Sequence, residues 1–365
     1  MSKNIDFSRI DRFVIENIEK TFPGASLAIY KKGEKIYEKV YGYSEIVPER
    51  RKVQEDTIFD LASLTKPLVT SLLAAKLVEE GLLHLRDKVS KILPEYSMTE
   101  AGFNEEKNRT EIWMLLTHSA CLPSWMPLYK IKGKSRKELF IEASRSFITC
   151  SPGTQASYSD IGYIVMTLLI ERITGERIDR LFEKMVAKPL GLEKTMFNPL
   201  EKNYPINKIA STELLREENI VLKGVVHDEN ARALDGVSGH AGLFSTADEV
   251  GMIVNEVLQS YLGKSDLLIK PATARSFLRK IICGDRCYSL GWMIYESSSA
   301  IFCGDLMSPG KAFGHTGFTG TSVCADPDLD IVIVFLSNRV HPTRENNKII
   351  EFRPRFHNLV VSTII

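Results

Sequence analysis

The sequence has almost no net charge, because 47 Lys and Arg residues are balanced by 46 Asp and Glu residues. A dedicated nucleic-acid-binding protein usually carries a strong positive excess, so this balance argues against that class of function. Hydrophobic residues make up 44% of the 365 positions and charged residues 25%. These fractions are typical of a globular protein with a sizeable core, although a local basic patch is compatible with them.

The sequence also lacks a long hydrophobic run. Its longest apolar run, residues 331–336, is far shorter than the roughly 20 apolar residues of a membrane-spanning helix. Residues 1–6 lack the apolar core of a signal peptide. We therefore predict a protein that has no membrane partner and is located in the cytoplasm.

Cysteine is scarce and scattered. The six cysteines are at positions 121, 150, 283, 287, 303 and 324. Only Cys283 and Cys287 are close together, and no second close pair completes the spacing of a zinc site. We therefore predict ordinary reduced thiols that pack as small hydrophobic residues.

Strand patterns lie at both ends of the chain, and helical patterns lie between them. Residues 25–31 and 35–40 predict a β-hairpin around Gly33, whereas helical periodicity dominates from about residue 60 to 190. Short strands return at residues 290–295, 321–325 and 331–337. This arrangement predicts an α+β fold, with one central antiparallel sheet built from both termini and a helical insertion.

Ser63 and Lys66 form a Ser-x-x-Lys motif, the first candidate for catalysis. A serine hydroxyl is a poor nucleophile until a neighbouring group can take its proton. Residues three apart on a helix share a face, with Cβ atoms about 5–6 Å apart, so Lys66 can reach the Ser63 hydroxyl. A helix start also directs backbone N–H groups at a developing oxyanion. The motif alone is weak evidence, because Ser308 and Lys311 match it across a Pro-Gly pair that forbids a helix.

Two later segments complete a three-part signature. Residues 158–160 (Tyr-Ser-Asp) lie just before a predicted helix, and residues 315–318 (His-Thr-Gly-Phe) enter a predicted strand. The order Ser-x-x-Lys, Tyr-x-Asn and Lys/His-Thr-Gly is typical of penicillin-binding proteins and serine β-lactamases. The sequence resembles the class C-like branch of this superfamily, which also includes serine esterases and D-amino-acid peptidases.

Further landmarks of that branch follow in the family's order, and the resemblance covers residues 7–340. They are residues 77–85, 92–96, 115–119, 122–123, 188–192, 241–246 and 288–292. The resemblance implies one β-lactamase/transpeptidase-like catalytic domain over residues 1–365. It also implies two subdomains: an α/β part from about residues 1–60 plus 240–365, and a mainly helical part from residues 61–239.

The resemblance also implies a role for each motif residue. Ser63 is the acylated nucleophile, and Lys66 is its proton acceptor or electrostatic partner. Tyr158 acts as general base in acylation and as general acid toward the leaving group. The backbone N–H groups of Ser63 and Phe318 form the oxyanion hole. The residues expected to contact substrate are Asp160, His315, Thr316 and Gly317, and no cofactor or metal is implied.

Two motif positions depart from the usual family pattern. Asp160 replaces an asparagine; its charge favours a protonated Lys66 and opposes ionisation of Tyr158, and it could instead bind a substrate amine. His315 replaces a lysine, and an imidazole with an ordinary pKa of about 6.5 is mostly neutral at pH 7. A neutral group there weakens the case for β-lactam turnover and suits neutral esters or peptides better.

A polar region between the second and third motifs has two interpretations. His227, Asp228, Glu229 and His240 are possible metal ligands by residue type, but nothing in the sequence fixes their geometry. The alternative is that residues 227–230 and His240 belong to a loop that lines the acyl pocket. Trp125 and Tyr129 are candidates for a loop over the site, although scattered aromatic residues usually serve packing.

The sequence therefore predicts a serine hydrolase that forms an acyl-enzyme on Ser63. Carboxylic esters, small amides or D-amino-acid peptides are the expected substrates. A β-lactamase or D,D-peptidase is the alternative enzyme, and a non-catalytic sensor on the same fold is a third interpretation. The intact Ser63, Lys66 and Tyr158 argue against the sensor. The expected partner is a small ester, amide or β-lactam molecule.

Overall fold

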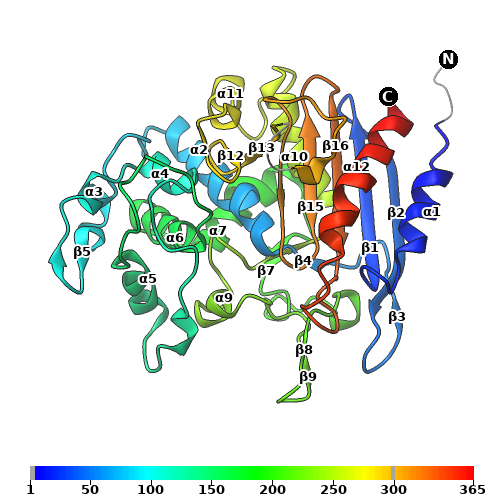
Figure 1. The fold of residues 1–365 in the computed structure, drawn as a ribbon, viewed down its shortest axis with the longest axis horizontal. Helices are drawn as coiled ribbons and strands as arrows, with labels where there is room; N and C mark the ends of the chain where they lie inside the picture. The colour runs from blue at the N-terminus through cyan, green and yellow to red at the C-terminus, as the bar shows by residue number, and fades with distance from the viewer. Residues whose placement is uncertain (1–4, 297–300) are drawn as a thin grey trace.

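Both ends of the chain contribute to one antiparallel sheet in a computed structural model, which describes residues 5–296 and 301–365. The nine strands lie in the order β11-β12-β13-β14-β15-β16-β1-β2-β3. β1 (Gly24–Lys31) pairs with β2 (Glu34–Glu45) on one side and with β16 (Ile331–Ser337) on the other (Figure 1). The predicted α+β class and the sheet built from both termini are confirmed.

The other strands are short. Those of the large sheet are β3 (Arg51–Lys52), β11 (Ile282–Cys283), β12 (Cys287–Tyr288), β13 (Met293–Ile294), β14 (Phe313–Thr316) and β15 (Ser322–Asp326). A three-stranded sheet joins β4 (Phe59–Asp60), β10 (Leu243–Ser245) and β7 (Met196–Phe197). Two small hairpins pair β5 (Met98–Thr99) with β6 (Gly102–Phe103), and β8 (Leu214–Leu215) with β9 (Ile220–Val221).

The apolar run in β16 is explained by burial on both faces of the sheet. Alternate side chains of a strand point to opposite faces. Val332 and Val334 pack in the core under α10 (Ala247–Tyr261), whereas Ile333 and Phe335 pack in a second core. That second core lies under α1 (Ser8–Glu16) and α12 (Ile349–Ile364). None of the helices in the described ranges has the length and apolar character needed to cross a membrane.

Most other helices lie beside the sheet, on the left of Figure 1. They are α2 (Leu72–Glu79), α3 (Val89–Ile92), α4 (Ile112–Leu116), α5 (Arg136–Ser144), α6 (Asp160–Thr174), α7 (Ile178–Phe182), α8 (Lys188–Leu190), α9 (Glu229–Ala233) and α11 (Pro271–Leu278). The predicted subdomain boundaries near residues 60 and 240 stay predictions.

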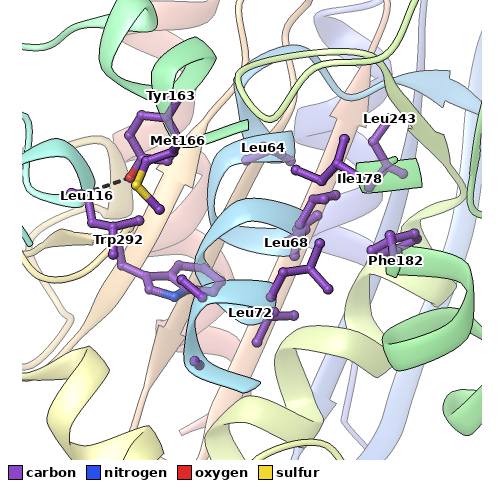
Figure 2. Packing of buried hydrophobic residues seen from close by; sticks show 14 of the residues in the cluster. Leu64, Leu68, Leu72, Leu116, Tyr163, Met166, Ile178, Phe182, Leu243 and Trp292 are labelled. Atoms are coloured by element: carbon purple, nitrogen blue, oxygen red, sulfur yellow. Dashed lines mark hydrogen bonds between the residues drawn. The ribbon is translucent and has the colours of Figure 1, made fainter. Parts of the chain in front are cut away.

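The helix that carries Ser63 crosses the centre of the larger core. It begins as a 3-10 turn (Ala62–Leu64), continues as a π-helical segment (Lys66–Ser71) and then becomes α2. Figure 2 shows its leucines on the side where Ile178, Phe182 and Leu243 lie, with Trp292 on the other side. This helix is surrounded by core residues on several sides, which explains why its sequence is apolar without a clear helical stripe. The same packing holds the turn that carries Ser63 in place.

The prediction of reduced thiols is wrong, because all six cysteines form disulfides. The pairs are Cys121–Cys150, Cys283–Cys287 and Cys303–Cys324, with Cα–Cα distances of 5.3, 4.0 and 5.8 Å. Two of these pairs are far apart in the sequence and are brought together only by the fold. Sequence spacing alone therefore could not reveal them.

Candidate active site

Ser63 and Lys66 are in direct contact, as the three-residue spacing predicts. The Lys66 Nζ donates to the Ser63 Oγ at 2.9 Å and to the carbonyl oxygen of His240 at 3.0 Å. It also forms an ion pair with the Asp160 Oδ1 at 2.6 Å. Lys66 is completely buried.

The turn before Ser63 is held in an unusual backbone conformation. Ala62 has a φ of 47°, in the left-handed region that non-glycine residues rarely adopt. The buried carboxylate of Asp60 accepts hydrogen bonds from the backbone N–H groups of Ala62, at 2.8 Å, and of His227, at 2.6 Å. Such strain costs about 1–3 kcal/mol and persists where the surroundings enforce it, often at functional sites.

Tyr158 approaches the same serine from the start of α6. The Ser159 side chain caps this helix by accepting from the N–H of Gly162 at 3.1 Å. The Ser159 N–H donates to the Nδ1 of His118 at 3.0 Å, and the His118 ring lies 4.5 Å from the Tyr158 ring. The Ser63 hydroxyl acts to lower the pKa of the Tyr158 phenol, and both residues line the same cavities. The nucleophile therefore lies beside both predicted proton-transfer groups.

The electrostatics of the site distinguish these two groups. Removal of water raises the pKa of the Tyr158 phenol well above 10, and the Asp160 charge raises it further. Burial has the opposite effect on the Lys66 amine and lowers its pKa below 10.5. Asp160 opposes that shift, with the sign expected from the sequence, but burial is the larger effect. Lys66 is therefore easier to deprotonate than a free lysine, and Tyr158 carries its proton at neutral pH.

His315 lies behind the site in β14. Its Nδ1 donates to the carbonyl oxygen of Thr316 at 2.9 Å, and its Nε2 has no hydrogen-bond partner within the described part of the chain. Burial and the Lys66 charge hold its pKa well below 6.5, so the ring is neutral. Its ring centre is 6.1 Å from that of Tyr158. His315 thus lies near Tyr158 as a neutral ring, whereas Thr316 and Gly317 line a cavity beside Ser63.

Hydrogen bonds fasten the segment after His315 onto the nucleophile turn. The hydroxyl groups of Thr319 and Thr321 donate to the carbonyl oxygens of Asp60, at 2.7 Å, and Leu61, at 3.0 Å. A Cβ atom on Gly317 would lie only 2.5 Å from the Leu61 carbonyl oxygen. Glycine is therefore required for the close approach of this strand to the turn that carries Ser63.

Two cavities meet at the nucleophile, and Ser63, Tyr158 and Phe318 line both of them. The first has a volume of about 420 Å³ and is also lined by Trp125, Tyr129, Asp160, His227, Asp228 and Glu229. The second has a volume of about 390 Å³ and is also lined by Asp285, Arg286, Thr316, Gly317, Arg339 and Arg353. A substrate whose carbonyl lies at Ser63 can therefore extend one arm into each cavity.

The polar region around His227 lines the first cavity, and its members pair with separate partners. His240 contacts Asp228 at 2.8 Å, His227 contacts Glu213 at 3.1 Å, and Arg344 contacts Glu229 at 2.7 Å. Within residues 5–296 and 301–365, no three His, Cys, Asp or Glu side chains form a group that could hold a metal ion. The arrangement favours the interpretation of this region as a pocket lining.

The arginines of the second cavity are functional candidates that sequence reasoning missed. Arg339 donates to the Phe318 carbonyl oxygen, and Arg353 from α12 donates to the carbonyl oxygens of Gly317 and Thr321. Arg286 makes one weak contact, from its Nη1 to the Met293 sulfur at 3.3 Å. It forms no ion pair with any carboxylate in the described ranges. No motif marks Arg286, so only the fold reveals its position.

Comparison with known proteins agrees with this geometry. The sequence model of the Beta-lactamase family matches residues 10–353. The chain belongs to the Beta-lactamase family. It is 32% identical to the "N-acetylmuramyl-L-alanine amidase" of Bacillus subtilis (strain 168), over 91% of this chain and 81% of that protein. It is 31% identical to the "Putative D-alanyl-D-alanine carboxypeptidase" of Escherichia coli (strain K12), over 92% of this chain and 82% of that protein.

Solved structures confirm the fold of this family member. The chain superposes on "EstCE1, a hydrolase with promiscuous acyltransferase activity" with a TM-score of 0.77 at 22% identity, covering 97% of each chain. It superposes on the octameric penicillin-binding protein homologue from Pyrococcus abyssi with a TM-score of 0.74 at 21% identity, covering 98% of this chain and 78% of that one. The predicted family, fold class and reaction class are thereby confirmed: the protein is a serine hydrolase.

Proposed function

We propose that this hydrolase cleaves the terminal bond of short D-amino-acid peptides, through an acyl-enzyme on Ser63. The observation that carries the proposal is the position of Arg286 beside Thr316, in the cavity that opens from the nucleophile. A guanidinium without a carboxylate partner is well suited to bind the free carboxylate of a substrate. The name of one relative, "Putative D-alanyl-D-alanine carboxypeptidase", supports the same substrate class.

In the proposed acylation step, neutral Lys66 takes the Ser63 proton as the Ser63 Oγ bonds to the substrate carbonyl carbon. The backbone N–H groups of Ser63 and Phe318 stabilise the oxyanion. The C–N bond then breaks, the Tyr158 hydroxyl donates its proton to the leaving nitrogen, and the proton held by Lys66 restores Tyr158. The raised pKa of Tyr158 suits this role of acid better than the role of base. In deacylation, water attacks the acyl carbon and gives a proton to Lys66, the bond from the acyl carbon to the Ser63 Oγ breaks, and that proton returns to the Ser63 Oγ as the acid product leaves.

The leaving group supplies the charge that the second cavity is suited to bind. In a peptide that ends in a free amino acid, only the nitrogen and the Cα atom separate the terminal carboxylate from the carbonyl carbon that Ser63 attacks. Three guanidinium groups and the single carboxylate of Asp285 line this cavity. The net positive charge of this cavity would hold the substrate carboxylate, the role of the family lysine that His315 replaces. Asp160, paired with Lys66, tunes the base under this proposal and does not bind a substrate amine.

A matched set of substrates separates this proposal from the alternatives. N-acetyl-D-alanyl-D-alanine, p-nitrophenyl acetate and a chromogenic cephalosporin represent the peptidase, esterase and β-lactamase activities. We expect the peptide to have the highest kcat/KM and Ser63→Ala to abolish its turnover. A preference for the neutral ester would favour the esterase. A protein that turns over none of the three would contradict the proposal.

Arg286→Gln tests the observation that carries the proposal. We expect it to raise the KM for the peptide about tenfold or more, because one charge-assisted interaction is worth about 1.5–3 kcal/mol. The kinetics with p-nitrophenyl acetate, which has no carboxylate, should stay within twofold of the wild type. Equal losses with both substrates would contradict a role of Arg286 in carboxylate recognition.

We also propose that the protein acts in an oxidising compartment, in place of the cytoplasm predicted from the sequence. Three disulfides support this location, since disulfides are rare in the cytoplasm outside hyperthermophiles. Peptides of the cell wall are accessible there, which agrees with the proposed substrate. Thiol labelling of the protein from its native cell, without added oxidant, should find no reactive cysteine.

A further inference from the structure

Arg286 lies in the turn of a hairpin that a disulfide closes. β11 and β12 pair so that Cys283 lies directly opposite Cys287. A disulfide joins the two, with their Cα atoms 4.0 Å apart. It encloses only Gly284, Asp285 and Arg286. The residue proposed to bind the substrate carboxylate is thus held within a short covalent loop.

The turn of this hairpin is short and largely exposed. β11 and β12 have two residues each, and β11 lies at the edge of the sheet. Cys283, Gly284 and Asp285 are exposed. One backbone hydrogen bond, from the Gly284 N–H to the Arg286 carbonyl oxygen at 2.8 Å, closes the turn. Hairpins this short are marginally stable, and their exposed tips are mobile without further support.

The hairpin rests on the segment that carries Tyr158. A Cβ atom on Gly284 would lie only 2.3 Å from the carbonyl oxygen of Ala156, two residues before the tyrosine. Ala156, Tyr158 and Tyr288 belong to one apolar cluster at this contact. The glycine therefore lets the hairpin backbone lie against the Tyr158 segment, and Arg286 is held beside the site.

We propose that the Cys283–Cys287 disulfide and Gly284 act as positioning residues for Arg286, and so set the preference of the enzyme for substrates with a free carboxylate. This inference rests on the carboxylate-binding role proposed above for Arg286. A disulfide between residues four positions apart adds less to global stability than one between residues 29 positions apart, such as Cys121–Cys150. Its larger effect is local, because a guanidinium already held in place loses less freedom when it binds its ligand.

Two ester substrates that differ only in the carboxylate test this inference. N-acetyl-D-alanyl-D-lactic acid has the free carboxylate, and its primary amide is neutral. Both are esters, so their cleavage can be measured whether or not the enzyme hydrolyses peptide bonds. The ratio of their kcat/KM values measures the preference for the carboxylate.

The Cys283→Ser/Cys287→Ser double variant should lower this ratio at least fivefold through a higher KM for the acid, with unchanged kinetics for the amide. Gly284→Ala keeps the disulfide but pushes the hairpin away from Ala156, so it should lower the ratio in the same way. Turnover of the neutral amide shows that each variant is folded. In an Arg286→Gln background, removal of the disulfide should have no further effect on the ratio.

Three results would overturn the inference. The first is an unchanged kcat/KM ratio of acid to amide in both hairpin variants. The second is that removal of the disulfide lowers this ratio as much in the Arg286→Gln background as in the wild type. The third is a wild-type enzyme that does not prefer the acid. Failure of the proposed function has a different signature. In that case the wild type cleaves the lactic acid ester with a carboxylate preference but leaves N-acetyl-D-alanyl-D-alanine intact.

Discussion

At the nucleophile, one carboxylate acts on two proton-transfer groups. Asp160 raises the pKa of Tyr158 and opposes the lowering of the Lys66 pKa by burial. Asp160 therefore makes Lys66 harder to deprotonate than its burial alone would. The family's usual asparagine would lack this charge, so under the proposed mechanism we expect Asp160 to influence the pH dependence of the enzyme.

Asp160→Asn should move the acid limb of the kcat/KM profile to lower pH. Loss of the negative charge lowers the pKa of both Lys66 and Tyr158, so the direction is the same whichever of them is the base. Activity below neutral pH should rise relative to the optimum. The measurement is a pH–rate profile of both proteins with one neutral ester. A limb that stays in place or moves upward would show that Asp160 does not act through this charge.

Lys107 is a second buried lysine, remote from the site. It is fully buried, and its Nζ donates to the carbonyl oxygens of Ser144, at 2.7 Å, and Ser146, at the end of α5. The ring of Tyr96 lies 4.5 Å from this amine. Burial lowers the pKa of Lys107 from 10.5 to about 7. Between these values the unfolded chain binds more protons than the folded protein, so stability rises with pH in that window.

Comparison with Lys107→Met isolates this contribution, because all other titrating groups are common to both proteins. The free energy of unfolding of the wild type should rise between pH 7 and pH 9 by more than that of the variant. A single titrating lysine can change the free energy of unfolding by at most about 1.36 kcal/mol per pH unit. Guanidinium chloride unfolding at both pH values gives the difference. Parallel pH dependence in the two proteins would contradict a lowered pKa of Lys107.

At the scale of elements, the three disulfides should contribute unequally to stability. They join residues 29, 21 and 4 positions apart in the sequence. By the loop-entropy relation, removal of Cys121–Cys150 should cost about 3–4 kcal/mol, and removal of Cys283–Cys287 about 2 kcal/mol. Unfolding of each double serine variant under non-reducing conditions tests the order. A larger cost for Cys283–Cys287 would contradict the local role proposed for that disulfide.

Elements with a clear local period could be predicted from the sequence. The hairpin around Gly33, the strand at residues 331–337 and the helix that follows Tyr158 are all present, because each is specified by its own residues. The contact between Ser63 and Lys66 follows from three-residue spacing in the same way. Such features need no knowledge of the rest of the fold.

The features that could not be predicted depend on segments far apart in the sequence. The partners of Cys121 and Cys303 are set by the packing of loops and strands, and no local pattern records them. The same holds for Arg286, which lines the cavity beside Ser63 and whose hairpin lies against Ala156. The direction of the Lys66 pKa shift also depended on how completely the fold buries that side chain.

At the scale of the whole molecule, the site lies where the helical part meets the sheet. Ser63 and Tyr158 come from the helical part, whereas Thr316 and Phe318 come from the sheet side of the chain (Figure 1). Hydrogen bonds from Thr319 and Thr321 join the two across this junction. The arrangement of the site therefore depends on contacts between segments that are far apart in the sequence.

Intact-mass and peptide mass spectrometry can detect the acyl group that Ser63 is expected to carry during turnover. The wild type is mixed with N-acetyl-D-alanyl-D-lactic acid and quenched in acid during turnover. We predict a mass increase equal to the N-acetyl-D-alanyl group, on the peptide that contains Ser63, and no increase in Ser63→Ala. An adduct on another residue, or turnover that persists in Ser63→Ala, would contradict the account.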